Sequence, residues 1–167
     1  MEGKVFILNG YATCGKDTFA QLVASHTSVA HFSIVDPIRD IINQLPMGVC
    51  ADLTKKDEKL RKLTSDLKLT LEEFSDYPYR EVEGFLSGAL KNYSCIFIDM
   101  REKQDIERLK KDYGAKLVFI ENKRITPITS NIADAKIDKN SYDILIKNNG
   151  TLEELEEEAK RFIAQYV

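Results

Sequence analysis

The sequence predicts an α/β fold, a three-layer sandwich in which a five-stranded parallel sheet lies between layers of helices. Strand-like and helical segments alternate along the chain, and this order produces parallel sheets through right-handed crossovers. Most of the strand-like segments are almost continuously apolar, as strands covered on both faces must be. The 167 residues, 43% hydrophobic and 31% charged, are enough for one domain with a buried core.

Five short runs of β-branched and aromatic residues predict the strands. In chain order they are Lys4–Leu8, Val29–Ser33, Cys95–Asp99, Leu117–Glu121 and Tyr142–Lys147.

Between the strands, apolar residues recur at helical spacing, which indicates helices with one buried face. The stripes are Phe19, Leu22 and Val23; Ile38, Ile41, Ile42 and Leu45; Val82, Phe85, Leu86 and Leu90; and Ile106, Leu109 and Tyr113. The last helix is predicted to begin at Thr151, which forms a capping box with Glu154. We expect this helix to bury Leu152, Leu155, Phe162 and Ile163.

The connection between the second and third strands is unusually long for a parallel crossover. Residues 37–94 fill it, and they carry a further stripe made of Leu60, Leu63, Leu67 and Leu71. Ligands of open α/β sheets bind at the carboxyl ends of the strands. We therefore interpret 37–94 as a helical insertion that binds an acceptor molecule, with a purely decorative insertion as the alternative.

A phosphate-binding loop follows the first strand. Its residues are Gly10, Tyr11, Ala12, Thr13, Cys14, Gly15, Lys16, Asp17 and Thr18, which contain the GxxxxGK frame of a Walker A loop. Glycines let the backbone turn its N–H groups towards one point, and the following helix adds its positive end. Lys16 supplies a charge for the β- and γ-phosphates. The loop predicts binding of a nucleoside triphosphate, ATP with Mg²⁺.

Two residues of this loop are candidates for the metal. Asp17 stands where a Ser or Thr normally follows the lysine, and its carboxylate suits a hard cation. Alternatively, Asp17 is a favourable acid in the first helical turn and Thr18 holds the metal. The sequence leaves these two possibilities open.

Other motifs argue against a GTPase switch. Such a switch needs Asp-x-x-Gly after a strand, but Asp99 is followed by Met100-Arg101-Glu102. It also needs Asn-Lys-x-Asp, and the segment that begins at Asn122 reads Asn-Lys-Arg-Ile. The phosphate loop is therefore interpreted as that of a kinase.

Charged residues at the ends of strands suit phosphoryl transfer, which depends on positioning and charge stabilisation. Asp99 is the candidate Walker B acid that holds a magnesium-bound water. Asp36, Arg39 and Arg101 are candidates for binding and orienting an acceptor phosphate. Asp36 with the following proline also fits a helix start, and the two arginines also fit a solvated surface. Arg124 is a candidate substrate-binding arginine of a lid.

Composition excludes several classes of function. The net charge of −3 provides no footprint for duplex nucleic acid or an anionic membrane. The apolar run at residues 5–8 is far shorter than the roughly 20 residues of a membrane span. Cys14, Cys50 and Cys95 have neither disulfide nor zinc spacing, which favours a cytoplasmic protein with reduced thiols. His26 and His31 show no partner pattern and are interpreted as structural.

The phosphate loop resembles the GYxxxGKDT loop of the deoxynucleoside monophosphate kinase family of phages and bacteria. Phe32–Arg39 is similar to that family's FADPLK segment, and Ile98–Glu102 resembles its D-x-R stretch. Further matching landmarks are Tyr113–Lys116, Tyr142–Asp143 and Asn148–Leu155.

The resemblance implies a P-loop kinase with the sheet order 2-3-1-4-5, a mobile lid at about 122–140, and transfer from ATP to a nucleoside monophosphate. It implies that Lys16 stabilises the transferred group and that Asp36, Arg39 and Arg101 face the acceptor. Asn148 and Asn149 would approach the adenine, or else serve as turn residues. The chain departs from the family pattern in its lid, because no arginine occurs between Arg124 and Asp138. A nucleotide-binding regulatory protein with weak or no kinase activity is therefore the alternative.

Overall fold

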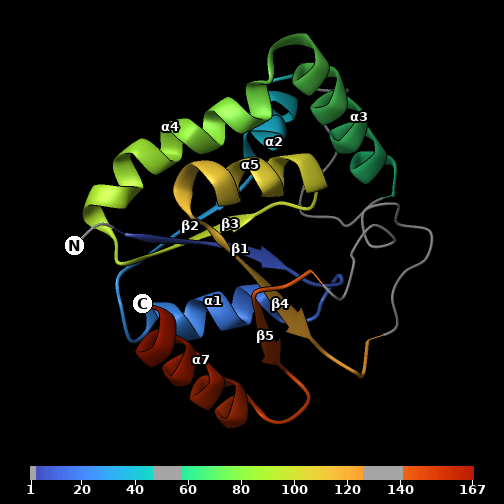
Figure 1. Ribbon diagram of the computed structural model, residues 1–167. Coiled ribbons are helices and arrows are strands. Elements are labelled where there is room, and N and C mark those ends of the chain that lie inside the picture. Colours follow the sequence, from blue (N-terminus) through green and yellow to red (C-terminus); the bar gives the residue numbers. More distant parts are fainter. Residues whose placement is uncertain (1–2, 47–57, 126–140) are drawn as a thin grey trace. The chain divides into compact units, whose positions relative to one another are not determined.

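The computed structural model describes residues 3–46, 58–125 and 141–167 (Figure 1). These residues divide into two compact units. The sheet unit comprises Met1–His31 and Gly88–Val167, and the helical unit comprises Phe32–Ser87. Each is described by itself.

The predicted sheet is confirmed, including its strand order. Strands β1 (Lys4–Asn9), β2 (Val29–Ser33), β3 (Cys95–Asp99), β4 (Lys116–Glu121) and β5 (Ile144–Lys147) form one sheet in the order β2-β3-β1-β4-β5. Strand β1 pairs in parallel with both β3 and β4, and β4 pairs in parallel with β5. Because β1 is central, the loop that follows it begins at the middle of the carboxyl edge.

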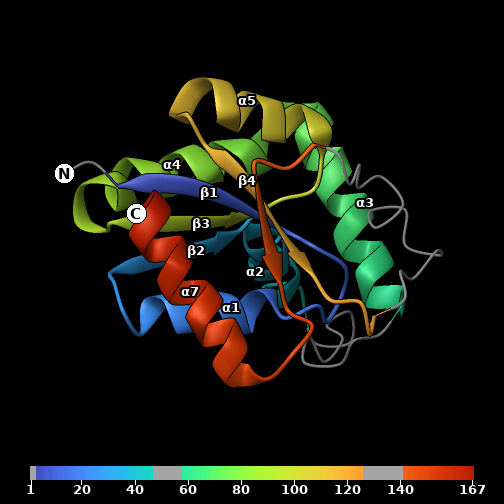
Figure 2. The ribbon, with the colours of Figure 1, turned by 60° about the horizontal axis from the view of Figure 1, so that its bottom comes forward.

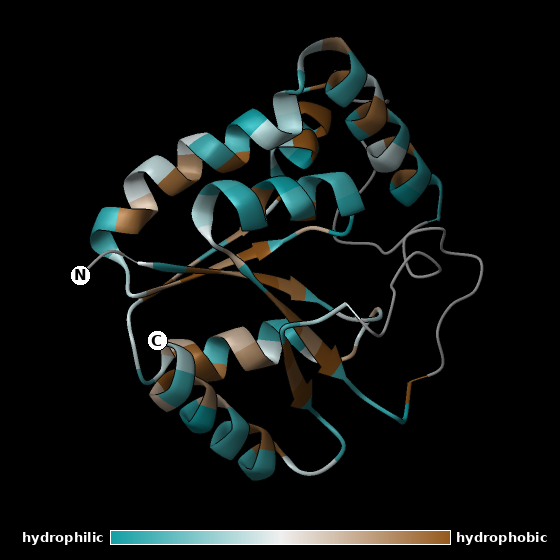
Figure 3. Ribbon diagram, viewed as in Figure 1, coloured by the Kyte–Doolittle hydropathy of each residue, from teal (hydrophilic) through white to brown (hydrophobic). Residues whose placement is uncertain are grey.

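Helices cover both faces of the sheet in the sheet unit. Helices α1 (Lys16–Ala24) and α7 (Leu152–Tyr166) lie together on one face, and α5 (Lys103–Tyr113) lies on the other (Figures 1 and 2). The strands are predominantly apolar along their length (Figure 3). The core on the α1 and α7 side includes the buried rings of Phe6, Phe19, Phe97 and Phe162.

The predicted start of α7 is confirmed, and one predicted core residue is wrong. Thr151 accepts from the Glu154 backbone N–H, and the Glu154 side chain accepts from Thr151 N–H, so the capping box is complete. Leu155 and Phe162 are buried, whereas Leu152 is 58% exposed. Leu152 is the first residue of the helix, before the turn at which α7 reaches the core.

The helical unit contains α2 (Asp36–Asn43), α3 (Glu58–Ser75) and the start of α4 (Tyr77–Asn92). Its buried apolar cluster is small and consists of Ile38, Ile42 and Leu60. The predicted stripe of α3 holds at Leu60 but is wrong at Leu63, which is exposed. Leu63 lies at the edge of the helix face, and Lys68 is buried instead.

No helix among the described residues is both long enough and apolar enough to span a bilayer. Cys14 and Cys95 are buried free thiols, and Cys50 lies outside the described residues.

Candidate active site

The loop after β1 has a tightly turned backbone. Gly10 has a φ of 149° and Gly15 a φ of 101°, values that L side chains rarely adopt. A Cβ on Gly10 would lie 2.5 Å from Cys14 Sγ and 2.9 Å from the Ile120 carbonyl oxygen. Thr13, with a φ of 63°, is a non-glycine residue in the left-handed region. The sequence pattern therefore reflects a tightly folded loop.

The loop leads directly into helix α1, whose N-terminus has no side-chain cap. Its N-cap residue is Gly15, and the Phe19 N–H donates to the Gly15 carbonyl at 2.9 Å. The preceding N–H groups of the first turn have no acceptor within the helix. An uncapped helix start after a folded loop is the arrangement that binds phosphate.

The ammonium of Lys16 points back over the loop. Its Nζ lies 3.4 Å from the Gly10 carbonyl oxygen and 3.5 Å from that of Tyr11. These bonds are long, so an incoming phosphate oxygen can compete for the ammonium with little loss. Asp17 and Thr18 are exposed in the first turn of α1. Both remain predicted metal contacts.

Asp99 ends β3 beside the central strand. It pairs in register with Leu8 of β1, two residues before Gly10. Its Oδ1 is 3.2 Å from Nε2 of His31, although the angles do not make a hydrogen bond. This buried oxygen has no hydrogen-bond partner among the described residues.

Arg101 lies close enough to the phosphate loop for its charge to act there. Burial raises the pKa of the Cys14 thiol and outweighs the positive charges of Lys16 and Arg101, which lower it. The side chains of Lys16 and Arg101 therefore both place positive charge near Cys14. Arg101 is half-buried, which is consistent with its predicted role beside the transferred phosphate.

The other two predicted acceptor residues lie in the helical unit. Arg39 Nη1 is 3.1 Å from Asp36 Oδ1, and Asp36 Oδ2 accepts from the Ser33 N–H at 3.3 Å. The N-cap of α2 is Val35, so Asp36 is a first-turn acid instead of the cap. Both side chains are at least half exposed, which leaves them available to a ligand.

Asn148 and Asn149 connect the end of β5 to the phosphate loop and to the residues after β4. Asn148 Nδ2 donates to the Cys14 carbonyl at 2.9 Å, and Asn149 Oδ1 accepts from the Lys123 N–H at 2.8 Å. Arg124 donates to the carbonyl oxygens of Asn149 at 2.6 Å and Gly150 at 3.2 Å. Both asparagines therefore shape the wall beside the loop. Of the predicted lid, residues 126–140 lie outside the described residues.

The residues at this edge fit Mg²⁺. Asp99 contributes a carboxylate whose Oδ1 is buried against His31 while 22% of its side chain stays exposed. No group of three or more His, Cys, Asp or Glu side chains that would hold a metal occurs in the described ranges. Mg²⁺ commonly binds one or two carboxylates, several waters and the phosphates of its substrate. A small set of protein ligands is therefore enough to hold this metal.

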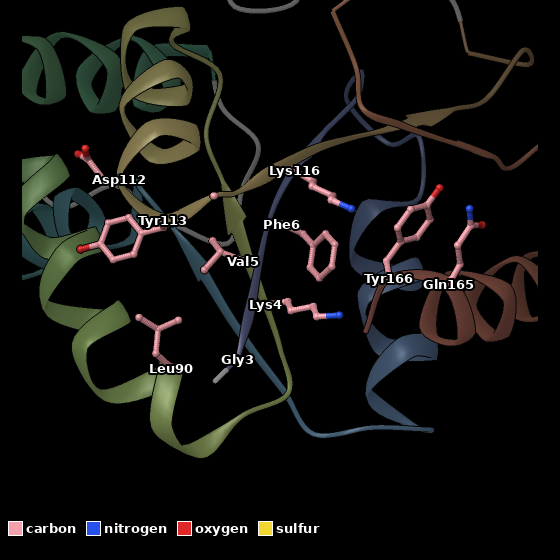
Figure 4. A pocket seen from close by; sticks show the side chains of 11 residues that line it. Gly3, Lys4, Val5, Phe6, Leu90, Asp112, Tyr113, Lys116, Gln165 and Tyr166 are labelled. Atoms are coloured by element: carbon pink, nitrogen blue, oxygen red, sulfur yellow. The ribbon is translucent and has the colours of Figure 1, made fainter. Parts of the chain in front are cut away.

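A separate cavity of about 500 Å³ lies at the amino ends of β1 and β4 (Figure 4). Lys4, Lys116 and Tyr166 are among the residues that line it. The ammonium of Lys116 is already engaged, because its Nζ lies 5.0 Å from the centre of the Tyr166 ring. This cavity is at the opposite ends of the strands from the phosphate loop.

Two residues near the loop were not singled out as functional by their sequence pattern. Buried Asn9 accepts from the Gly10 N–H through its side chain at 2.9 Å and so braces the start of the loop. His31 approaches Asp99. In the expected order 2-3-1-4-5, the second and third strands, which carry His31 and Asp99, are neighbours. That adjacency is the sequence signal that could have indicated this contact.

Comparisons with known proteins identify the fold. TT1252 from Thermus thermophilus matches over 100% of both chains, with a TM-score of 0.58 and 14% identity. A dephospho-CoA kinase from Campylobacter jejuni matches over 98% of this chain and 97% of its own, with a TM-score of 0.56 and 16% identity. A gluconokinase from Sinorhizobium meliloti 1021 covers 98% and 93%, with a TM-score of 0.50 and 10% identity.

The chain therefore has the fold of P-loop kinases. No protein-family model matches it, and no curated protein matches its sequence.

Proposed function

We propose that this protein catalyses ATP- and Mg²⁺-dependent phosphoryl transfer to a nucleoside or deoxynucleoside monophosphate, or to a similar small phosphorylated acceptor. One observation carries the proposal. The loop between β1 and α1 combines left-handed glycines, an uncapped helix start and the inward-facing ammonium of Lys16. This combination suits a chain of phosphates more than a single carboxylate, because it offers several N–H groups and a mobile cation.

The residues of the loop divide the work on ATP. Backbone N–H groups of the loop hold the phosphates, apart from those of Gly10 and Cys14, which donate to Asn9 Oδ1 and the Tyr11 carbonyl. Lys16 follows the charge that develops on the transferred group. Asp17 or Thr18 contacts the metal directly, while Asp99 accepts from a metal-bound water. When bound, Mg²⁺ neutralises charge on the β- and γ-phosphates. Asn148 and Asn149 are proposed to form the adenine side of the site.

For the acceptor we propose Arg101 and Asp36, together with Arg39 from the helical insertion at 37–94. Guanidinium groups bind phosphate through paired N–H donors, which also orients the attacking oxygen. The pairing of Arg39 with Asp36 holds that guanidinium in place before a ligand arrives. Arg124 is proposed as a further phosphate contact.

The proposal is tested by measuring ADP formation with ATP, Mg²⁺ and a panel of acceptors. The panel contains ribonucleoside and deoxynucleoside monophosphates and, because a dephospho-CoA kinase shares the fold, dephospho-CoA. At least one acceptor should raise ADP formation clearly above the rate with ATP alone. An ATP-binding sample that responds to none of them would refute the kinase proposal.

Lys16→Ala tests the phosphate loop itself. Removing this charge-assisted contact should weaken ATP binding by about 1.5–3 kcal/mol, roughly 10- to 150-fold in Kd. Lys103→Ala is the matched control, because the Lys103 side chain on α5 is 92% exposed. Calorimetry should show the loss for the first variant alone, and equal affinities would contradict the assignment.

A nucleotide-binding regulatory protein is the second candidate. It is favoured by Arg124, whose guanidinium is already bonded to the carbonyl oxygens of Asn149 and Gly150. It is also favoured by the absence of a further arginine in the sequence up to Asp138. Saturable ATP binding with slow, acceptor-independent hydrolysis would support this function over transfer.

A further inference from the structure

Two histidines of the sheet unit approach carboxylates at the same distance but in different surroundings. His31 Nε2 lies 3.2 Å from Asp99 Oδ1, at the edge of the sheet that carries the phosphate loop. His26 Nε2 lies 3.2 Å from Glu156 Oε1, where both side chains are more than a third exposed. His31 therefore contacts a partly enclosed carboxylate, whereas the contact between His26 and Glu156 lies at the surface.

The surroundings of Asp99 limit what can hold its carboxylate. Its side chain is 22% exposed, yet Oδ1 is fully buried, so the accessible part of the side chain lies on other atoms. A carboxylate oxygen accepts hydrogen bonds, so an N–H at Nε2 of His31 is the kind of group that can hold Oδ1. His31 Nε2 lies against this oxygen at 3.2 Å.

The imidazole of His31 is itself held in position. Its ring meets the ring of Phe97 edge to face, with centroids 6.2 Å apart and an interplanar angle of 78°. Phe97 is fully buried in β3, two residues before Asp99. A fixed strand residue therefore orients the imidazole that approaches the acid.

We propose that His31 is a positioning residue for the metal, acting through Asp99. By holding Oδ1, it keeps the carboxylate in the orientation in which Oδ2 would accept from a magnesium-bound water. The inference rests on the proposed function, because it requires that Asp99 serve the metal. Groups behind a metal contact commonly change metal affinity 10- to 100-fold when removed. The imperfect alignment agrees with this role, since such contacts often tighten only when the ligand is bound.

The experiment measures how much Mg²⁺ is needed for a non-hydrolysable ATP analogue to raise the melting temperature. We expect His31→Ala to raise the half-maximal Mg²⁺ concentration about tenfold, at the low end of the range for such groups. Asp99→Asn should raise it by at least as much, and the double variant should add little to Asp99→Asn. His31→Gln retains an N–H donor of similar reach and should restore most of the affinity.

The matched control is His26→Ala, which removes the other histidine–carboxylate contact. It should leave the Mg²⁺ requirement unchanged, even if it lowers the melting temperature of the free protein. A purely structural role for His31 would likewise lower that melting temperature without moving the Mg²⁺ midpoint.

The outcomes separate the two proposals. If the wild-type protein shows no Mg²⁺-dependent shift with the analogue, the proposed function fails. If Asp99→Asn moves the midpoint but His31→Ala does not, the function stands and the role of His31 is wrong. If neither variant moves it, the metal role of Asp99 and the inference fail together.

Discussion

The sheet unit and the helical unit bury their side chains to different degrees. In the sheet unit, strands β1 and β3 are almost completely buried, and four phenylalanine rings meet in one core. In the helical unit the buried apolar cluster has three members, and a lysine, Lys68, is buried nearby in the same unit. Phe74 of α3 is 85% exposed.

This difference suits two tasks that the proposed phosphoryl transfer would require. A phosphate loop needs N–H groups that are fixed before the ligand arrives, and a close-packed core resists displacement. An acceptor site gains from elements that repack around different ligands, and sparsely buried helices open at lower free-energy cost. The contrast can be tested at single residues of each unit.

The aromatic core of the sheet unit should be the more sensitive region. Phe162 is 1% exposed, and its ring centroid lies 4.8 Å from that of Phe6 and 5.5 Å from that of Phe19. Phe162→Ala should lower the free energy of unfolding by about 3–5 kcal/mol, because it leaves a cavity. Phe74→Ala in the helical unit should change it by less than about 0.5 kcal/mol. Urea denaturation measures both, and similar losses would contradict the contrast.

The fold of the sheet unit was largely predictable from sequence. Strands β1, β3 and β4 are apolar on both faces, so their positions follow from the apolar runs in the sequence, as in Cys95–Asp99. The capping box at Thr151 is a local pattern and fixes the start of α7. The helical unit was less predictable, because its faces are only partly covered. Periodicity alone does not show that Leu63 is exposed and Lys68 buried.

The residues of the candidate site also differ in how well the sequence predicts them. The phosphate loop is contiguous in sequence, and its glycine spacing reports the backbone geometry directly. The contacts of Asp99 with His31 and of Asn148 with Cys14 join residues far apart in the chain. Such contacts depend on which strands are neighbours and on side-chain rotamers, and no local pattern encodes either. Sequence reasoning therefore singled out the loop but not the residues that support it.

The dry interior of the sheet should also make stability fall at alkaline pH. Burial raises the pKa of Cys95 from 9.0 to about 12. The raised pKa means that the folded state keeps the proton that the unfolded state releases above pH 9. This thiol's contribution is therefore intact below pH 9 and is lost progressively between pH 9 and 12. From pH 8 to 10.5 the loss should be about 2 kcal/mol.

The measurement compares urea denaturation of the wild type and Cys95→Ala across that pH range. Other groups titrate equally in both proteins, so the difference between their slopes isolates the thiol. The variant should lose less stability with rising pH. Parallel curves would show that Cys95 ionises in the folded protein as readily as in the unfolded chain.

Two glycines give the last comparison, because the same substitution should have opposite effects. Gly15, in the phosphate loop, has a left-handed φ, and an added Cβ would collide with Asn148 Nδ2. Gly15→Ala should therefore cost about 1–2 kcal/mol in backbone strain and weaken ATP binding. It would also disturb the bond from Asn148 to the Cys14 carbonyl.

Gly84 in α4 belongs to the helical unit, and an added Cβ there would meet nothing within 4 Å. Gly84→Ala should raise the free energy of unfolding by about 0.5–1 kcal/mol, because alanine loses less backbone entropy in a helix. ATP affinity should not change. Denaturation and calorimetry on both variants distinguish a glycine required by local geometry from one that the fold merely tolerates. If Gly84→Ala instead lowered the free energy of unfolding, this face of α4 would be closely packed, which would contradict the sparse burial inferred for the helical unit.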